Sequence, residues 1–400
     1  MKENSFYVAE RNDDTHDRYF IEKGDTFESV AKKLGVEWQT LRTYHNIHCV
    51  ADEDVINANF PSHLKSLLLR RVKLQINGEP EEIPLKKAVL NKGHKIPFNH
   101  VTIKNKYGVM YTIENGEQID TLKYEVSVNW ITTDNNGYSL FEIDRLSKIY
   151  INDTEADLVA DELAEKTSSV LYPLRVVIDQ EGEWMDVHNY EEIEERWQIR
   201  KNEILENYPG EQTIKYLTLF EKNLESNQTL SLVLANDWFI RSFFNGIHTD
   251  YTSKLAFKGY TYFPFIAKSD DLIFDIEQKV DEYLDENDLI NINLKGVLDE
   301  KRMKTEFENE LGHSSKSLSS QETTGSYRAK YFLNPNNYSI QTLFIECTLA
   351  LDIPQKYTVV VSNLKEKENQ FLRTNSLYVG AGKKKDDGIF KMIGDVFRGR

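Results

Sequence analysis

The chain has 400 residues, of which 28% are charged and 40% are hydrophobic, and its formal net charge is −16 at pH 7. This length allows two or three domains with at least one large core, and the composition is that of a folded protein. Phosphate backbones and anionic lipids are held by basic surfaces, so the acidic balance argues against a nucleic-acid or membrane-surface protein.

The number of cysteines and the lengths of the apolar runs indicate the cellular compartment of the protein. Cys49 and Cys347 are the only cysteines, too few for a disulfide framework or a cysteine metal site. The first twenty residues lack the apolar segment of a signal peptide, and no run of about 18 apolar residues occurs. We therefore expect a cytoplasmic protein in a reducing compartment, without a membrane span or Sec export.

The first pattern along the chain is YFIEKGDTFESVAKKLGVEWQTLRTYHN, at residues 19–46. Residues 19–21 are predicted to form a short strand, followed by a turn that contains a glycine and an aspartate. Apolar residues at i, i+3, i+4 and i+7 then predict a helix over 27–34, and a similar spacing predicts a second helix over 36–46. The apolar run 67–69 is the expected closing strand, which gives the order strand, helix, helix, strand.

These residues resemble a LysM domain, over about residues 16–72. The resemblance rests on KGDTFESVAKKLGV and on LRTYHNI, where that family has a Leu followed by an Asn. In that family N-acetylglucosamine polymers, including peptidoglycan and chitin, lie in a shallow groove between two loops. The resemblance implies that Gly24, Asp25, Thr26 and Phe27 form one glycan-binding wall. The second loop, NIHCVADEDVINANFPSHLKSLLL, departs from the family's Asn-Pro and Pro-Gly-Gln turns.

Two uses of this module stay open from its sequence. The turn and cap residues are needed for folding whether or not a sugar binds, so the module either holds glycan or docks a protein. A metal site formed by His45, His48, His63 and Cys49 is a further hypothesis. The alternative is that this segment is a solvated polar loop. The spacing fits no standard zinc pattern, so we expect no metal.

The middle of the chain changes from an expected connector to an α+β domain. Residues 73–122 are predicted to be a connector with a few strands, because Gly and Pro interrupt each apolar group. Residues 124–130 alternate between apolar and polar side chains and precede an Asn-Gly turn, which predicts a strand of a hairpin. The predicted larger domain, residues 123–378, is antiparallel sheet with an inserted helical hairpin or bundle.

Helices and further strands of this domain follow in order. Helical spacing is found over 154–171, 190–208 and 211–247, and a hairpin is expected over 175–188. Strand patterns then recur in six segments, and those around Tyr124 and Tyr327 are expected to be two halves of one sheet. These segments are KLAFKGYTYFPFIA, DLIFDIEQKV, NINLKGVLD, YRAKYFLN, YSIQTLFIECTLAL and QKYTVVVSNL.

The C-terminal residues 379–400 form the one locally basic stretch. The apolar spacing there predicts a short amphipathic helix that either docks into a partner's groove or packs on its own domain. The residues expected to dock are Ile389, Phe390, Ile393 and Phe397.

A catalytic constellation is absent from the sequence patterns. The chain has no Gly-x-Ser-x-Gly elbow, Walker loop, Gly-x-Gly-x-x-Gly fingerprint or His-Glu-x-x-His pair. Acid pairs such as Glu191 with Glu195, or Asp179 with Glu183, are candidates for the acid and base of a glycosidase, but a chain with 65 acidic residues contains such pairs by chance. We therefore predict a protein that is not an enzyme and needs no cofactor.

The function expected from the sequence is binding or assembly. LysM modules without signal peptides occur in contractile injection machines and type VI secretion systems, and the chain resembles uncharacterised LysM proteins of Bacteroidota. The resemblance implies a bacterial adaptor that docks peptidoglycan or a protein of such an assembly. The alternative is a peptidoglycan-targeting effector or cell-wall enzyme delivered by a non-Sec route. A third possibility, a small apolar ligand enclosed by the larger domain, follows from its aromatic residues alone.

Overall fold

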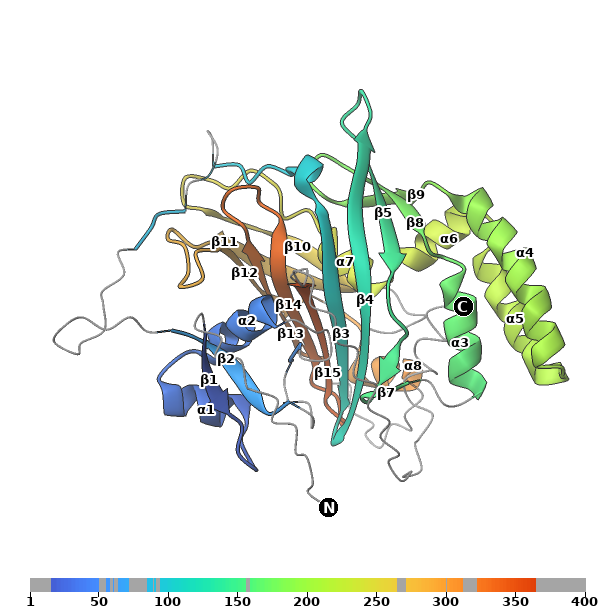
Figure 1. Ribbon diagram of the computed structural model, residues 1–400, viewed down its shortest axis with the longest axis horizontal. Helices are drawn as coiled ribbons and strands as arrows, with labels where there is room; N and C mark the ends of the chain where they lie inside the picture. Colours follow the sequence, from blue (N-terminus) through green and yellow to red (C-terminus); the bar gives the residue numbers. More distant parts are fainter. Residues whose placement is uncertain are drawn as a thin grey trace, which may run out of the picture.

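The computed structural model describes residues 16–49, 55–57, 60, 64–71, 85–88, 90, 94–155, 159–264, 271–299, 301–311 and 322–364. A small unit of two helices and two strands lies beside a large antiparallel sheet, and more helices lie at the far end of that sheet (Figure 1). No helix in the described part of the chain is long and apolar enough to cross a membrane.

The small unit, here called the N-terminal unit (residues 16–71), has the strand and helix order predicted from its sequence. Its elements are β1 (His16–Phe20), α1 (Phe27–Leu34), α2 (Trp38–His48) and β2 (Ser66–Arg70). β1 and β2 pair antiparallel, with Tyr19 opposite Leu67. The apolar faces of both helices pack on this pair, and Phe27, Val30 and Leu41 are buried between them.

The large sheet contains thirteen strands in the described residues and is antiparallel throughout. Its main path runs β10-β11-β12-β13-β14-β15-β3-β4-β5-β8-β9, and off this path β6 pairs with β4 and β7 pairs with β6. The strands are β3 (Lys104–Asn115), β4 (Gln118–Thr133), β5 (Ser139–Arg145), β6 (Tyr150–Ile151), β7 (Thr154–Glu155), β8 (Leu174–Ile178), β9 (Trp184–Val187), β10 (Ala256–Phe263), β11 (Leu272–Val280), β12 (Ile290–Leu298), β13 (Gly325–Leu333), β14 (Ile340–Leu349) and β15 (Gln355–Leu364). The segments around Tyr124 and Tyr327 therefore belong to one sheet, as predicted.

Residues 73–122 were predicted to be a connector with a few strands, and the structure places two of the strands of the large sheet partly or wholly in this segment. β3 and the start of β4 lie in that segment, and β3 pairs with β15 on one side and β4 on the other. Its neighbouring side chains Val109 and Met110 are both buried because each face of the sheet is covered here. Burial on both faces removes the alternation that marks a half-exposed strand, which explains why the sequence pattern did not single out β3.

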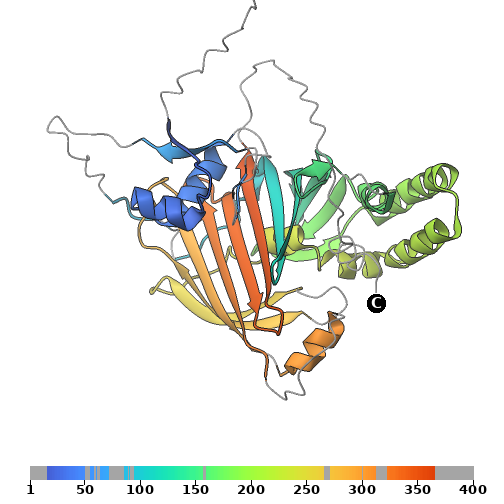
Figure 2. The same ribbon diagram turned by 90° about the horizontal axis from the view of Figure 1, so that it is seen from below.

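Helices connect several of the strands. Their bounds are η2 (His100–Thr102), α3 (Val159–Ser169), α4 (Tyr190–Asn207), α5 (Glu211–Asn223), α6 (Asn227–Leu234), α7 (Trp238–Phe243) and α8 (Lys304–Glu310). Helices α3 to α6 lie near the β9 end of the sheet, whereas α7 lies against its central strands and α8 lies apart from both (Figures 1 and 2). Figure 2 shows α4 and α5 side by side, extending away from the sheet. Trp197 of α4 packs on Phe220 of α5, with ring centroids 4.8 Å apart, and is almost fully buried.

The two faces of the sheet carry different covers. Figure 2 shows the N-terminal unit over one face of the central strands, which we call the outer face. On the opposite, inner face α7 brings Trp238 and Phe243 against the sheet. The Trp238 ring lies 5.3 Å from Tyr111 of β3 and 5.2 Å from Tyr357 of β15, and Phe243 lies 5.0 Å from Tyr107. The central strands are thus buried on both sides.

Candidate functional site

The turn between β1 and α1 contains the four residues predicted to line a glycan groove. Gly24 has φ +95°, a conformation that favours glycine, and is exposed at the tip of the turn. The Asp25 backbone N–H donates to the Glu22 carbonyl over 3.0 Å and closes the turn. The backbone of this turn is therefore held in one conformation at the surface.

The Asp25 carboxylate holds this turn together from within. It accepts hydrogen bonds from the Tyr19 hydroxyl and the Glu22 backbone N–H, both over 2.8 Å. Its other oxygen pairs with Lys33 Nζ at 2.8 Å, and only 5% of the side chain is exposed. The hydrogen bond from Lys33 is the largest of the effects that lower the Asp25 pKa to about 2. Both carboxylate oxygens thus bind groups of the turn and of α1, and a ligand would have to compete with these contacts.

Thr26 and Phe27 also have structural contacts. The Thr26 hydroxyl accepts from the Ser29 backbone N–H over 3.2 Å, and Ser29 Oγ accepts from the Thr26 N–H over 2.9 Å, which forms a capping box. The Phe27 ring is 1% exposed and lies 4.4 Å from the Phe60 ring. Of the four predicted residues, Gly24 and Thr26 remain at the surface and Phe27 lies in the core.

The ion pair between Asp25 and Lys33 predicts how the stability of the fold depends on pH. Since the folded-state pKa of Asp25 is lowered from 3.8 to about 2, its ionised form stabilises the fold above pH 3.8, and this contribution is lost as the pH falls toward 2. Asp25→Asn is expected to lower the urea midpoint at pH 7, and the difference from wild type should shrink between pH 4 and 2.5. Lys33→Met is the matched variant, because it removes the partner and should shift the loss to higher pH. A difference that is constant with pH would contradict this role.

The loop that follows α2 is fixed to the N-terminal unit by Asn46. Its side-chain amide donates to the Ile56 carbonyl over 2.9 Å, while its oxygen accepts from the Ile56 N–H over 2.8 Å. Residues 50–54, 58–59 and 61–63, which contain much of the second loop of the expected groove, lie outside the described residues.

The histidines near this loop do not form a metal site in the described residues. His45 is buried, and its Nδ1 accepts from the Leu68 backbone N–H over 3.1 Å. The His48 ring stacks near those of Tyr44 and His16, and Cys49 is buried. His63 lies outside the description. Within the described ranges no three His, Cys, Asp or Glu side chains are grouped to hold a metal ion.

Helix α2 packs on the outer face of the large sheet, a contact that the sequence did not predict. Arg42 is 2% exposed, and its guanidinium carbon lies 3.8 Å from the centre of the Phe344 ring of β14. The Trp38 ring is 4.9 Å from the same carbon and meets Phe344 edge-on at 6.0 Å. Burial lowers the Arg42 pKa to about 9. The available signal was Trp38 followed by Arg42 at i+4, a cation and an aromatic ring on one side of a helix.

Apolar and polar contacts extend this docking surface. Met110, Phe344, Val360 and Leu364 of the sheet form one buried cluster with Cys49 and Val55. A second cluster joins Ile47 to Leu289 and Phe332. The Asn57 side chain donates to the Thr112 hydroxyl of β3 over 2.6 Å. The N-terminal unit is thus attached to the sheet by a continuous buried surface, which holds the β1–α1 turn at a fixed position relative to the sheet.

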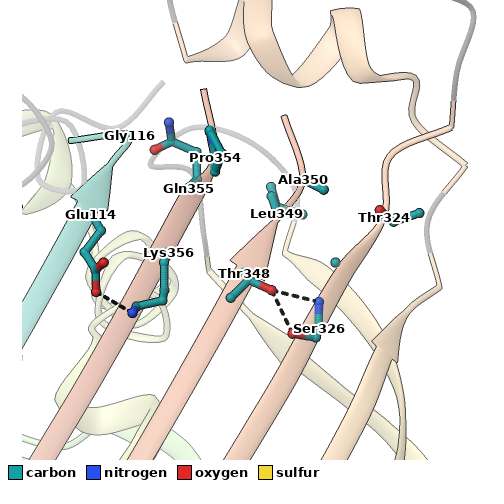
Figure 3. Close-up of a pocket in the computed structure, with 11 residues that line it drawn as sticks. Glu114, Gly116, Thr324, Ser326, Thr348, Leu349, Ala350, Pro354, Gln355 and Lys356 are labelled. Carbon is teal, nitrogen blue, oxygen red and sulfur yellow. Dashed lines mark hydrogen bonds and ion pairs between the residues drawn. The ribbon is translucent and has the colours of Figure 1, made fainter. Parts of the chain in front are cut away.

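A cleft of about 480 Å³ lies at the ends of β13, β14, β15 and β3 (Figure 3). Its charged residues pair with each other, since Lys356 Nζ lies 2.6 Å from a Glu114 carboxylate oxygen. The Ser326 and Thr348 hydroxyls are 2.7 Å apart and hydrogen-bonded. A ligand would compete with these contacts, so the cleft offers mainly neutral hydroxyl and backbone groups.

The other titratable candidates are separate and serve local structure. Asp179 accepts from the backbone N–H groups of Glu181 and Glu183, which forms the β8–β9 turn. Burial lowers the pKa of His248 to about 4, and Cys347 is fully buried on the inner face. The Glu191 and Glu195 side chains are exposed on α4. Ile389, Phe390, Ile393 and Phe397 of the predicted docking tail lie outside the described residues.

No protein-family model matches the chain, and no curated protein shows significant similarity to it.

Proposed function

We propose that this protein is a non-enzymatic adaptor in which a LysM-like unit at residues 16–72 and a large sheet present one rigid binding surface. The observation that carries the proposal is the docking of α2 on the sheet through Trp38, Arg42 and Phe344. A module that only recruits a catalytic domain to a polymer functions well on a loose linker. A large buried contact instead fixes the orientation of the N-terminal unit on the sheet, which is what an assembly component needs.

The exposed turn of the N-terminal unit is the docking point in this proposal. Its side chains Asp25 and Phe27 are used internally, so recognition falls to the backbone around Gly24 and to exposed neighbours such as Lys23 and Thr26. A rigid backbone turn suits either an N-acetylglucosamine polymer or a protein surface. The resemblance to LysM modules of contractile injection and type VI secretion assemblies favours a bacterial partner of that kind.

Binding to purified peptidoglycan distinguishes the two ligands. We expect the full chain to co-sediment with sacculi if the turn holds glycan, and Lys23→Trp to reduce the bound fraction several-fold because it blocks the turn without removing a hydrogen bond. Lys32→Trp is the matched control, since it places the same bulk at the exposed C-terminal end of α1. Equal loss in both variants would show that the turn is not the binding point.

Two further experiments distinguish an adaptor from an effector. If the full chain does not bind sacculi, the proposal requires a stable complex with a purified baseplate or spike protein of an injection assembly. Loss of that complex in Lys23→Trp alone would support protein docking at the turn. Clearing of a sacculus suspension by the purified chain would overturn the non-enzymatic proposal and favour a peptidoglycan-targeting effector.

A further inference from the structure

The two ends of the large sheet differ in how their outer edges are covered. At one end β9 is only four residues long, and neighbouring segments take up its backbone N–H groups. The Trp184 N–H donates to the Phe244 carbonyl over 3.3 Å, and the Val187 N–H donates to Ser231 Oγ over 3.2 Å. These are ways in which natural proteins protect an edge strand from pairing with other chains.

The other end, β10, is longer, and no described residue pairs with its outer edge. Among the described residues β10 pairs with β11 alone. The Val280 N–H donates to the Leu255 carbonyl over 2.8 Å, and these two residues are opposite in the extended register. Hydrogen-bonded pairs alternate along an antiparallel ladder, so odd-numbered residues face β11. The N–H and C=O groups of Lys258, Tyr260 and Tyr262 therefore point away from the sheet.

This open stretch is bounded at both ends. The Ala256 carbonyl already accepts a hydrogen bond from the Thr252 hydroxyl over 2.8 Å. Pro264 has no N–H, and its carbonyl accepts from Trp238 Nε1 over 2.8 Å. The edge available for pairing thus extends from Lys258 to Tyr262, and its midpoint is Tyr260.

We propose that β10 pairs with β10 of a second copy of this chain, antiparallel, about a two-fold axis at Tyr260. In this register Lys258 lies opposite Tyr262 of the partner subunit on the outer face. Tyr260 is 60% exposed and Tyr262 is 49% exposed in the single chain, so both rings gain burial on pairing. Lysine beside an exposed tyrosine ring adds a cation–π contact on each side of the axis.

The coverage of β9 favours a second copy joined at this edge over a longer chain of copies. Pairing of β10 with β9 of another molecule would leave free ends and produce an open filament. The contacts of β9 with Phe244 and Ser231 oppose that arrangement. Pairing of β10 with itself uses the same surface twice and closes after two subunits, and it joins two large sheets into one.

The test is the mass of the full chain in solution, measured by sedimentation equilibrium over a concentration series. We expect wild type to approach twice its monomer mass of 46.7 kDa as concentration rises. Tyr260→Pro should remain monomeric, because proline removes an edge N–H that β11 does not use and its ring obstructs the incoming strand. Circular dichroism and a melting curve close to those of wild type would show that the variant is folded.

Two further measurements make the test specific to the edge. Val297→Lys changes a 65% exposed residue on the outer face of β12, two strands away, and should leave the dimer intact. Amide exchange at Lys258, Tyr260 and Tyr262 should slow at high concentration, with little change at Thr261. A wild type that remains monomeric up to its solubility limit would overturn the proposal. A dimer that persists in Tyr260→Pro would also overturn it.

Discussion

Phe344→Ala is expected to destabilise the chain by about 3–5 kcal/mol and to loosen the N-terminal unit from the sheet. The Phe344 side chain is 4% exposed and contacts both Arg42 and Trp38 of α2. Removing the ring leaves a cavity and takes away the aromatic surface on which the buried guanidinium rests. In the described residues Arg42 Nη1 has no hydrogen-bond partner, so its burial depends on these rings.

Urea unfolding measures the stability loss, and hydrogen exchange locates it. Amides of α1 and α2 are expected to exchange faster in Phe344→Ala, while those of α7 on the opposite face change little. Phe344→Leu is the matched variant, because it retains most of the apolar volume and loses the cation–π contact, at a cost of about 1 kcal/mol. Unchanged protection in α1 and α2 would show that the two parts do not depend on this contact.

The second large effect is expected on the inner face. Trp238→Ala should cost about 3–5 kcal/mol, because Trp238 is 9% exposed and packs on Tyr111, Phe263 and Tyr357. The substitution also removes the indole donor from the Pro264 carbonyl, a hydrogen bond of 2.8 Å. A buried acceptor without a partner adds to the loss.

Hydrogen exchange distinguishes this effect from that of Phe344→Ala. In Trp238→Ala the amides of α7 should exchange faster. The order of exchange rates among the amides of α1 and α2 should stay as in wild type. Trp238→Phe is the control that keeps an aromatic ring but no indole N–H, and we expect it to lose less stability than the alanine variant. Equal losses for the phenylalanine and alanine variants would assign the effect to the hydrogen bond rather than to packing.

Phe344 and the tyrosines that contact Trp238 lie on the same three strands. β14, β15 and β3 carry Phe344 toward the N-terminal unit and Tyr357 and Tyr111 toward α7. A shift of these strands therefore changes the orientation of the β1–α1 turn. In the proposed adaptor, stability of the sheet and orientation of the docking point depend on each other, and the proposed β10 pairing would double the number of docking points per assembly.

Local sequence patterns determined many of the elements. Thr26 and Gly35 are cap residues by type, and the structure places them at the ends of α1. The alternation at 124–130 predicted part of β4, and the Asn-Gly turn that follows it has Gly137 at φ +88°. The six strand patterns after residue 251 correspond to β10–β15. Such features depend on neighbours a few residues apart, so a single sequence carries their signal.

The tertiary structure alone decided which distant residues meet. β3 was predicted to be part of a connector, yet it pairs with β15 across about 240 residues of chain, with Asn115 opposite Gln355. The burial of Arg42 depends on Phe344, and the open edge of β10 depends on strand order. Side-chain periodicity records how much of an element is buried but not which element covers it. For that reason the sequence determined the α+β class and the N-terminal pattern, while the docking surface and the free edge followed from long-range pairing.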